Sequence, residues 1–589
     1  MTVDAVVLQI VRGALTATLK EMELVIERTA MSPVIREKAD HFVGIYDRQG
    51  RIVDAHIGMS GARMVDPVLE HFPVETMEPG DVYWYNDPHR SRGAIQHNGD
   101  MCFVSPIFID GELTAFGIAF GHFWDIGGTV PGSLSPHATE IFHEGTLVPP
   151  IRIIHAGTLN RDAYAVILNN SRYPEALEGD TRALMAACRL ADARVSELAA
   201  RYGRATIASA FDEIVNRSVE AYRAYARELI AEGEYHFFDY LDQDPVGGES
   251  RRIDVRITRR GDKIVADLTG SGPQARGPVN FIATPGAVGL MAGRLFCYLN
   301  PELSLNEGAL HIFDEVLTKP GTITQPNFPA ATGLRSHTAI RLIGCVLGAL
   351  GQATGGNSPA GTPVYVIYML RTASEYFSEG VGSGQGARPT ADGINAIYQR
   401  DQKNYPIEYE EREFPMLVEN YSIRQDSSGP GYNRGGAGVV REVRVLTDCI
   451  MATRMDNARF PPFGANQGAA GAPGRIIVNP GTAEETEINP VDEGISLKAG
   501  DLLRVETCGG GGWGDPFTRE PERVRRDVLE GYVSVAGAET DYGVVLDRES
   551  LQIDQAATDK LRSAFRPERP FFDRGAAARE RLVAMGVSE

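Results

Sequence analysis

The first 30 residues repeat apolar side chains at the spacing of an α-helix. These side chains are Val7, Ile10, Leu15, Leu19, Met22 and Ile26. Apolar residues that recur every three or four positions lie on one face of a helix. Ser32 and Pro33 then interrupt the pattern, as a proline does beyond a helix end. The spacing therefore predicts a long opening helix that packs on one face.

The pattern changes several times along the rest of the chain. Between residues 42 and 160, short apolar runs alternate with glycine-containing turns, which is typical of β-hairpins. Further on, the sequence predicts helices over 160–233, strands over 251–272, helices near 284–299 and 336–353, a Pro/Gly/Ser-rich linker at 425–440, strands over 438–507 and a charged helical end from 517.

This order of elements predicts an α+β protein of several domains, because a chain of 589 residues is too long for one hydrophobic core. We expect a hairpin-rich N-terminal region flanked by long helices, then a mixed α/β region and a β-rich region. The predicted domains are residues 1–235, 236–425, 426–516 and a helical tail, 517–589, that contacts another subunit.

Composition narrows the class of protein. The formal net charge of −20 disfavours nucleic acids and anionic membranes as partners, because both would be repelled. No apolar run approaches the roughly 20 residues that cross a bilayer. The six cysteines show no C-x-x-C spacing, and the N-terminus has no basic segment before its apolar stretch. These features predict a cytoplasmic protein with reduced thiols.

Candidate chemistry is concentrated near the N-terminus, where eight of the 12 histidines precede residue 145. His97 and Asp100 lie three positions apart, just before a predicted strand, and His122 ends the next predicted strand. Two imidazoles and a carboxylate at one end of a hairpin would suit a divalent metal with open positions for water or substrate. The alternative is a polar loop with local side-chain hydrogen bonds.

The hairpin register decides whether these side chains can meet. A two-residue loop at Asp110-Gly111 would set Asp100 and His122 on opposite faces of the sheet. A three-residue loop, 109–111, with Gly111 left-handed in a G1 bulge, would place His122 opposite Asn98 and on the same face as Asp100. We predict the three-residue loop. Asp40, just before the first predicted strand, is a possible fourth ligand.

The glycine-rich stretches do not resemble a nucleotide site. Residues 508–516 and 382–389 lack the order G-x-x-x-x-G-K-[ST] and the lysine that would reach a phosphate. We interpret both as places where two backbones approach closely, with anion binding the less favoured alternative. Any ATP chemistry would therefore require a partner.

Several separate motifs occur in one order along nearly the whole chain. They are Pro79-Gly80-Asp81-Val82, Asn86-Asp87-Pro88, His97-x-x-Asp100, His122 with Asp125-Ile126-Gly127-Gly128, Pro131-Gly132-Ser133, Ala138-Thr139-Glu140-Ile141-Phe142, Glu144-Gly145, Asp267-Leu268-Thr269-Gly270-Ser271, Leu305-Asn306-Glu307-Gly308, Arg434-Gly435-Gly436 and residues 509–516. In these motifs the chain resembles the hydantoinase B/oxoprolinase family, which includes ATP-dependent hydantoinases, 5-oxoprolinase, lactam hydrolases and related acetone and acetophenone carboxylases.

The resemblance implies a division of labour between two subunits. A separate A-type subunit would bind ATP and Mg and phosphorylate a carbonyl oxygen. The B-type subunit, which this chain resembles, would hold a divalent metal, Zn or Mn, where the activated species is attacked. The resemblance carries metal ligation onto His97, Asp100 and His122, and onto Asp40. For Asp125 we predict a role as base or as hydrogen-bond partner of a metal-bound histidine.

Three functions remain open at this point. The first is a hydrolase subunit that opens a cyclic amide. The second is a ketone carboxylase subunit, which is favoured by Phe123-Trp124 where hydrolases of the family commonly have a second histidine, and by a changed stretch at 333–337. The third is a non-catalytic scaffold for the ATP-binding subunit.

Overall fold

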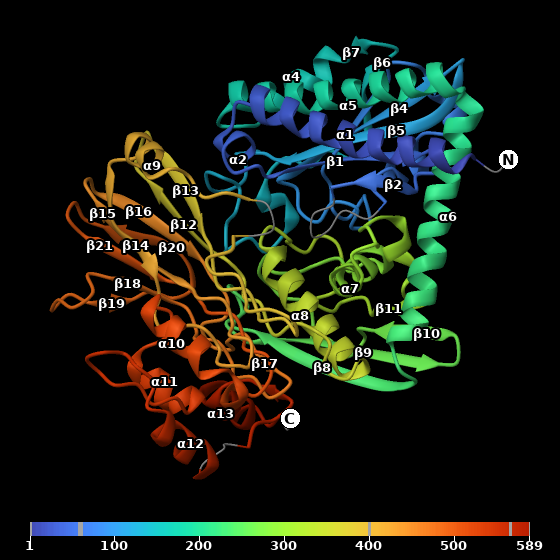
Figure 1. Cartoon of the computed structure of the whole chain (residues 1–589). Helices are drawn as coiled ribbons and strands as arrows, with labels where there is room; N and C mark the ends of the chain where they lie inside the picture. Colours follow the sequence, from blue (N-terminus) through green and yellow to red (C-terminus); the bar gives the residue numbers. More distant parts are fainter. Residues whose placement is uncertain (1–2, 57–62, 399–401, 565–567, 588–589) are drawn as a thin grey trace. The chain divides into compact units, whose positions relative to one another are not determined.

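The computed structural model describes residues 3–56, 63–398, 402–564 and 568–587. By its contacts the chain divides into two compact units (Figure 1). Unit 1 contains residues 1–234 and 255–339, and unit 2 contains residues 235–254 and 340–589. The first predicted boundary, at 235, lies where the chain leaves unit 1, whereas those at 425 and 516 both fall inside unit 2.

Unit 1 is built on a seven-stranded sheet in the order β2-β1-β5-β4-β3-β6-β7. Its strands are β1 (His41–Asp47), β2 (Ile52–Ala55), β3 (Val82–Tyr85), β4 (Asp100–Ile109), β5 (Glu112–His122), β6 (Ile151–His155) and β7 (Thr158–Leu159). The pairings of β1 with β5 and of β5 with β4 are antiparallel. The strand that ends at His122, β5, thus lies between its hairpin partner β4 and the first strand of the chain, β1.

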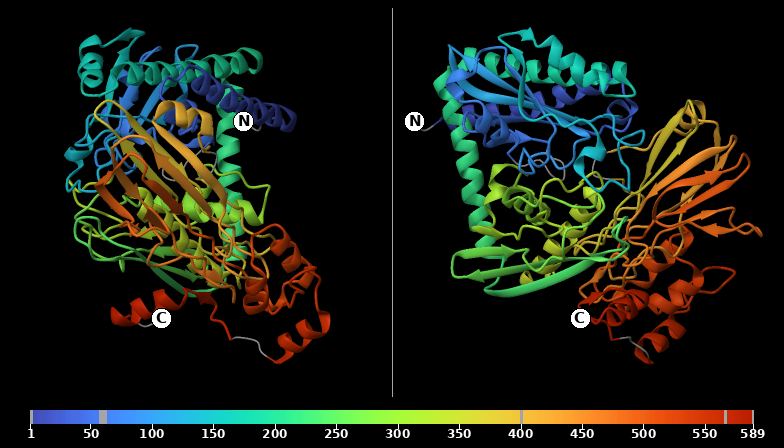
Figure 2. Two further views of the ribbon diagram at one scale, coloured as in Figure 1. Left: turned by 90° about the vertical axis from the view of Figure 1, so that its left-hand side faces the viewer. Right: turned by 180° about the vertical axis from the view of Figure 1, so that it is seen from behind.

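Long helices cover one face of this sheet. The opening helix α1 (Ala5–Thr29) lies beside α5 (Pro174–Tyr202), and both pack on the strands (Figures 1 and 2). Asp4 caps α1 by accepting the amide protons of Val6 and Val7. The predicted helix is thereby confirmed, although its buried face runs through Leu8 and Val11 while Ile10 is 40% exposed.

The remaining elements of unit 1 include further helices and part of a second sheet. The helices are α2 (Pro33–Arg36), α3 (Asp66–His71), α4 (Arg161–Asn169), α6 (Arg204–Leu229) and α7 (Pro285–Leu299), with 3₁₀ turns η1 (Val74–Thr76), η2 (Ile141–Glu144) and η3 (Glu307–His311). The second sheet has the order β11-β10-β9-β8, with β8 (Gly233–Leu241), β9 (Arg251–Arg260), β10 (Lys263–Asp267) and β11 (Glu315–Leu317). Strand β8 from Tyr235 on and strand β9 through Asp254 belong to unit 2, so the chain passes from one unit to the other within β8, β9 and α8 (Arg335–Ala353).

Unit 2 contains two antiparallel sheets that share one apolar core. One sheet is β13 (Tyr376–Val381), β12 (Val366–Arg371), β16 (Cys449–Arg454) and β20 (Val491–Leu497), and the other is β14 (Met416–Ile423), β15 (Val439–Val445), β21 (Leu502–Glu506), β18 (Arg475–Val478) and β19 (Thr486–Glu487). Val366, Tyr368 and Leu370 alternate into this core, as the period of a strand requires. The predicted β-rich region, 426–516, thus supplies most of the strands of these two sheets.

Short helices complete unit 2. They are α9 (Ile407–Glu413), η4 (Pro516–Thr518), α10 (Pro521–Leu529), α11 (Val535–Tyr542), α12 (Gln555–Ala564) and α13 (Ala576–Ala584), and β17 (Gly464–Ala465) pairs with β22 (Phe572–Asp573). A small apolar cluster that includes Val524 and Tyr542 forms where α10 and α11 meet. The α+β, multidomain class is confirmed. Among the described residues, no helix is long and apolar enough to span a bilayer.

The glycine-rich stretches of unit 2 are sites of close backbone approach, as predicted. A Cβ on Gly509 would lie 1.7 Å from the carbonyl oxygen of Ser427, and one on Gly510 would lie 2.0 Å from that of Gln385. A Cβ on Gly384 would lie 1.9 Å from the oxygen of Gly436. Only glycine fits where these segments cross.

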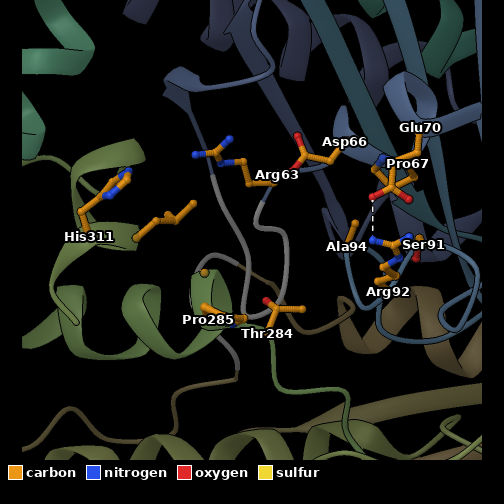
Figure 3. Close-up of a pocket in the computed structure, with 12 residues that line it drawn as sticks. Arg63, Asp66, Pro67, Glu70, Ser91, Arg92, Ala94, Thr284, Pro285 and His311 are labelled. Atoms are coloured by element: carbon orange, nitrogen blue, oxygen red, sulfur yellow. Dashed lines mark ion pairs between the residues drawn. The ribbon is translucent and has the colours of Figure 1, made fainter. Parts of the chain in front are cut away.

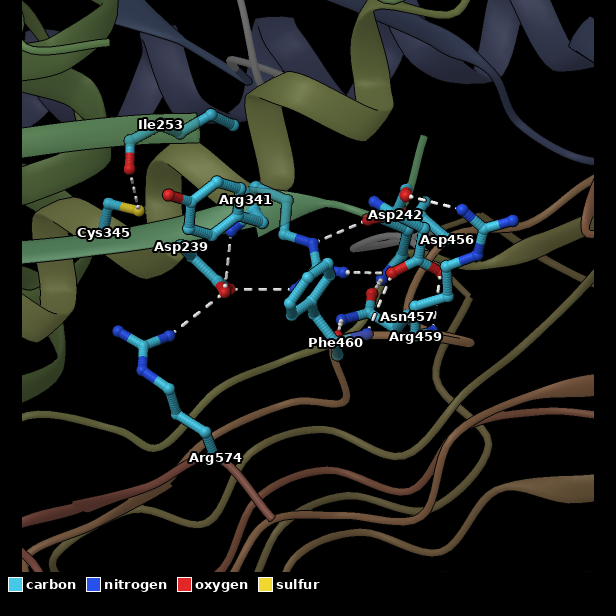
Figure 4. Close-up of polar contacts among 12 residues, drawn as sticks. Asp239, Asp242, Ile253, Arg341, Cys345, Asp456, Asn457, Arg459, Phe460 and Arg574 are labelled. Carbon is cyan, nitrogen blue, oxygen red and sulfur yellow. Dashed lines mark hydrogen bonds and ion pairs between the residues drawn. The ribbon is translucent and has the colours of Figure 1, made fainter. Parts of the chain in front are cut away.

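A buried charge cluster joins separate segments of unit 2 (Figure 4). The Arg341 guanidinium donates to Asp239 at 2.9 Å, to Asp456 at 2.6 Å and to Asp242 at 3.3 Å. The side chain of Arg341 is only 3% exposed. One cation therefore compensates three carboxylates from two segments, with help from Arg574 at Asp239.

Removing that cation should destabilise unit 2. Arg341→Met leaves buried carboxylates without their partner, which typically costs about 3–5 kcal/mol. We expect a clearly lower melting temperature of the whole chain in calorimetry. The matched control is Arg444→Met, whose ion pair with Glu419 is exposed and should contribute little. Equal melting temperatures for the two variants would contradict this account.

Candidate metal centre

The turn between β4 and β5 has two residues. Asp110 and Gly111 both have positive φ, 54° and 79°, which is the pattern of a type I′ turn. Next to the turn, Ile109 pairs with Glu112. The predicted three-residue loop is therefore wrong.

A β-bulge farther along the hairpin corrects the register. Phe108 pairs with Leu113 but Ile107 pairs with Ala115, so Thr114 is an extra residue on β5. The shift of one position places Asp100 directly opposite His122. The two side chains therefore share a face, which the two-residue turn alone would not allow.

His97, Asp100 and His122 meet at this end of the hairpin. His97 Nε2 lies 2.8 Å from Asp100 Oδ1, and His122 Nδ1 lies 3.1 Å from each of these two atoms. The imidazole rings stack with centroids 4.9 Å apart. His97 is 1% and Asp100 4% exposed, whereas His122 is half-buried. One side of the cluster is thus enclosed and the other remains accessible.

The three ligand atoms fit one divalent cation. With metal–ligand bonds of about 2.0–2.1 Å, adjacent ligands lie about 3.0 Å apart in octahedral and about 3.4 Å apart in tetrahedral geometry. The observed separations of 2.8–3.1 Å lie close to the octahedral value and below the tetrahedral one. Nδ1 of His97 is buried and has no hydrogen-bond partner among the described residues.

The protonation states of His97 and Asp100 also suit metal binding. Burial, together with the charge of Arg335, lowers the pKa of His97 to about 3, so its ring is neutral. Burial opposes ionisation of Asp100, but His97 and Arg335 outweigh it and hold the pKa of this carboxyl well below its usual range. A neutral imidazole and an ionised carboxylate are the forms that bind a cation.

The backbone beside the cluster is shaped by Gly99. A Cβ at this position would lie 2.8 Å from His122 Cε1 and 2.9 Å from His97 Cε1. The side-chain amide of Asn86 donates to the carbonyl of Asn98 at 2.7 Å and holds the same loop. Gly99 therefore lets the two rings approach each other.

Asp40 lies next to the cluster through its backbone. Its carbonyl oxygen accepts the amide proton of His122 at 3.0 Å. Its carboxylate is not among the three ligand groups whose atoms lie within 4.8 Å of one another. Ligation by Asp40 remains a prediction.

Within the described part of the chain, the carboxylate of Asp125 contacts no histidine. Its carboxylate accepts hydrogen bonds from the amides of Gly127, Gly132 and Arg172, and the Arg172 guanidinium donates to it at 2.8 Å. The side chain is fully buried. These hydrogen bonds hold the loop after β5 in place, and the role of Asp125 as base or as hydrogen-bond partner of a metal-bound histidine stays a prediction.

Two functional candidates were missed from the sequence. Arg335, at the start of α8, donates from Nη2 to Asp100 Oδ2 at 3.1 Å. Glu144 is fully buried, its Oε1 accepts the amide proton of Gly333 at 2.6 Å, and its Oε2 has no partner among the described residues. Arg335 lies 235 residues from Asp100, and Gly333 lies 189 residues from Glu144. No spacing rule relates positions so far apart, although Glu144-Gly145 is one of the family motifs and 333–337 is one of the stretches that depart from them.

Taken together, these features define a mixed α/β protein with an enclosed His/Asp cluster of the kind that binds a metal. The model of the family described as Hydantoinase B/oxoprolinase matches residues 4–516, and the chain belongs to this family. The resemblance predicted from the motifs is thus confirmed.

Named relatives cover almost the whole chain. The caprolactamase beta subunit of Pseudomonas jessenii is 30% identical, over 96% of this chain and 100% of that protein. The B-type subunit of the putative D-/L-hydantoinase of Pseudomonas sp. (strain NS671) is 29% identical, over 95% and 98%. The crystal structure of the ATP-dependent caprolactamase from Pseudomonas jessenii matches with a TM-score of 0.84 and 27% identity, over 96% of this chain and 100% of that chain.

The acetophenone carboxylase delta subunit of Aromatoleum aromaticum is also similar. It is 27% identical, over 89% of this chain and 84% of that protein. Relatives of this chain are therefore subunits of ATP-dependent hydrolases and of carboxylases.

Gly99 offers a direct test of the cluster's geometry. Gly99→Ala should push the two imidazoles apart and weaken binding of Zn²⁺ or Mn²⁺ by about tenfold or more, as loss of ligand orientation typically does. Competition with a chromophoric chelator measures this affinity. The control is Gly13→Ala, where a Cβ meets nothing within 4 Å. Unchanged affinity in Gly99→Ala would show that the rings do not share an ion.

Glu144 should make stability depend on pH. Burial raises its pKa to about 8, from about 4.5 in an unfolded chain. The folded state then keeps a proton that the unfolded state has lost, so this group's contribution to stability is full below about pH 4.5 and falls as pH rises to about 8. Glu144→Gln does not titrate. Its melting temperature relative to wild type should rise between pH 5 and 8; a constant difference would contradict the raised pKa.

Proposed function

We propose that this chain is the metal-dependent B-type subunit of an ATP-dependent amidohydrolase. It would open a cyclic amide after an A-type partner subunit has phosphorylated that amide with ATP and Mg. The observation that carries the proposal is the convergence of His97, Asp100 and His122, with ligand atoms 2.8–3.1 Å apart. The similarity to caprolactamase and hydantoinase subunits over nearly full length supports the hydrolase class.

The chain's own residues would hold and orient the cation. His97, Asp100 and His122 would hold Zn or Mn, and Arg335 fixes the second oxygen of Asp100 so that the first faces the histidines. When bound, a divalent cation supplies Lewis-acid stabilisation of developing negative charge and lowers the pKa of water. His122 is the least buried of the three, so a substrate carbonyl would approach the cation from its side.

The aromatic pair that favoured a ketone substrate has other contacts. Phe123 is 1% exposed and belongs to the hydrophobic core of unit 1. Trp124 stacks on Tyr173 with ring centroids 4.2 Å apart. Both rings therefore stabilise the fold, and Phe123 is not exposed to a substrate. The ketone carboxylase remains the second candidate, supported by the similarity to the acetophenone carboxylase delta subunit.

Reconstitution with the A-type partner tests the proposal. With ATP, the pair should hydrolyse at least one of hydantoin, 5-oxoproline or a lactam. His97→Ala and His122→Ala should lower the rate by about 100-fold or more and lose the bound metal, since each removes one ligand. The exposed His137 provides the control, and His137→Ala should keep both rate and metal.

Other outcomes separate the alternatives. Transfer of labelled bicarbonate into an organic acid from an aryl ketone, without amide hydrolysis, would establish the carboxylase. Full activity and metal content in both ligand variants would leave only the scaffold.

A further inference from the structure

Unit 1 contains a cavity of about 350 Å³ that does not include the metal cluster (Figure 3). Its walls are α3, the loop 91–94, the start of α7 and the end of η3. Small-molecule sites typically enclose about 300–1,000 Å³, so this volume suits a metabolite smaller than a nucleotide. Charged side chains of both signs line it.

Most of these charges already have partners. Arg63 and His311 both contact Glu307, which is fully buried. Arg92 pairs with Glu70 at 2.9 Å. None of these lining cations forms a close ion pair with the remaining lining carboxylate, Asp66.

Asp66 is the uncompensated group. Its carboxylate forms no hydrogen bond or close ion pair with any residue in the described part of the chain. Burial raises the pKa of Asp66 to about 6, and the charge of Arg63 offsets only part of this effect. An ammonium group placed beside Asp66 would supply the missing positive charge.

The opposite wall has the reverse polarity. Figure 3 shows Thr284 and Pro285 across the cavity from Asp66. They begin the 15-residue helix α7, where Thr284 accepts the amide proton of Ala287 and Pro285 has no amide proton. The Gly286 amide has no partner among the described residues and lines the cavity. The partial positive charge of a helix N-terminus adds to this donor.

We propose that this cavity binds a small zwitterion, with its ammonium at Asp66 and its carboxylate at the start of α7. The choice of ligand rests on the proposed function. Hydrolysis of a lactam by water breaks the C–N bond and leaves a carboxylate and an ammonium on the same molecule, whereas a hydantoin ring opens to a carboxylate and a neutral ureido group. Carboxylation of a ketone yields no ammonium. The cavity therefore suits the ring-opened product of a lactam hydrolase.

The cavity is connected to the metal centre by one loop. Gln96, adjacent to His97, donates from Nε2 to the carbonyls of Gly93 and Ile282, at 2.7 and 2.8 Å. Its side-chain oxygen accepts the Ile282 amide proton. The lining loop 91–94 and the ligand-bearing segment are thus held together, so product in the cavity contacts the loop that carries His97.

Calorimetric titration of the full chain tests the proposal without ATP, metal or partner. The probes are γ-aminobutyrate, δ-aminovalerate and ε-aminocaproate, with caproate and hexylamine as probes that lack one charged group. At least one zwitterion should bind about tenfold more tightly than either single-charge probe, the value expected for one charge-assisted hydrogen bond. Asp66→Asn should weaken that binding by about tenfold. Asp262→Asn, at an aspartate 90% exposed, is the control and should not.

Three results would overturn the proposal. These are no binding of any zwitterion to wild type below about 10 mM, equal affinity for hexylamine and the zwitterions, and unchanged affinity in Asp66→Asn. The comparison among probes needs no variant, so a folding defect in Asp66→Asn cannot obscure it. Because catalysis is not measured, failure of the amidohydrolase assay and failure of zwitterion binding are distinguishable.

Discussion

The candidate site of unit 1 depends on the pairing of Asp100 with His122 across β4 and β5. The tight turn at Asp110 and Gly111 would by itself set these side chains on opposite faces of the sheet. One extra residue in β5 reverses that outcome. The hairpin is stiff because β1 and β3 hydrogen-bond to its outer edges, so the site is built on rigid strands.

Local patterns could be predicted from the sequence, and long-range ones could not. The periodicity of apolar residues predicted the opening helix, and the turn residues predicted the hairpin. The three-residue spacing of His97 and Asp100 can be read directly from the sequence. The bulge at Thr114 could not be anticipated. A longer turn and a bulge within the strand both bring Asp100 and His122 to one face, and no local feature of the sequence distinguishes between them. Arg335 reaches Asp100 only through tertiary packing, and Asp125 pairs with Arg172, 47 residues away.

The division of the chain into two units also depends on long-range contacts that the sequence does not reveal. A linker rich in Pro, Gly and Ser suggested a boundary near residue 425, yet that segment lies inside unit 2. Residues 235–254 join unit 2 through β8 and the Arg341 cluster, while the next 85 residues return to unit 1. Such exchange leaves no compositional mark, because each strand or helix keeps its ordinary pattern whichever core it enters.

The glycines at 509–512 bear on how mutational data for this chain should be interpreted. Each lies about 2 Å or less, measured from an added Cβ, from a carbonyl of another segment. A saturation scan would therefore register them among the least tolerant positions of the molecule, although they are not part of the cluster of His97, Asp100 and His122. Loss of function on substitution at these glycines would reflect the close approach of two backbone segments. A ranking of positions by the size of the mutational effect would therefore place these glycines ahead of the histidines and aspartate at the hairpin end in unit 1.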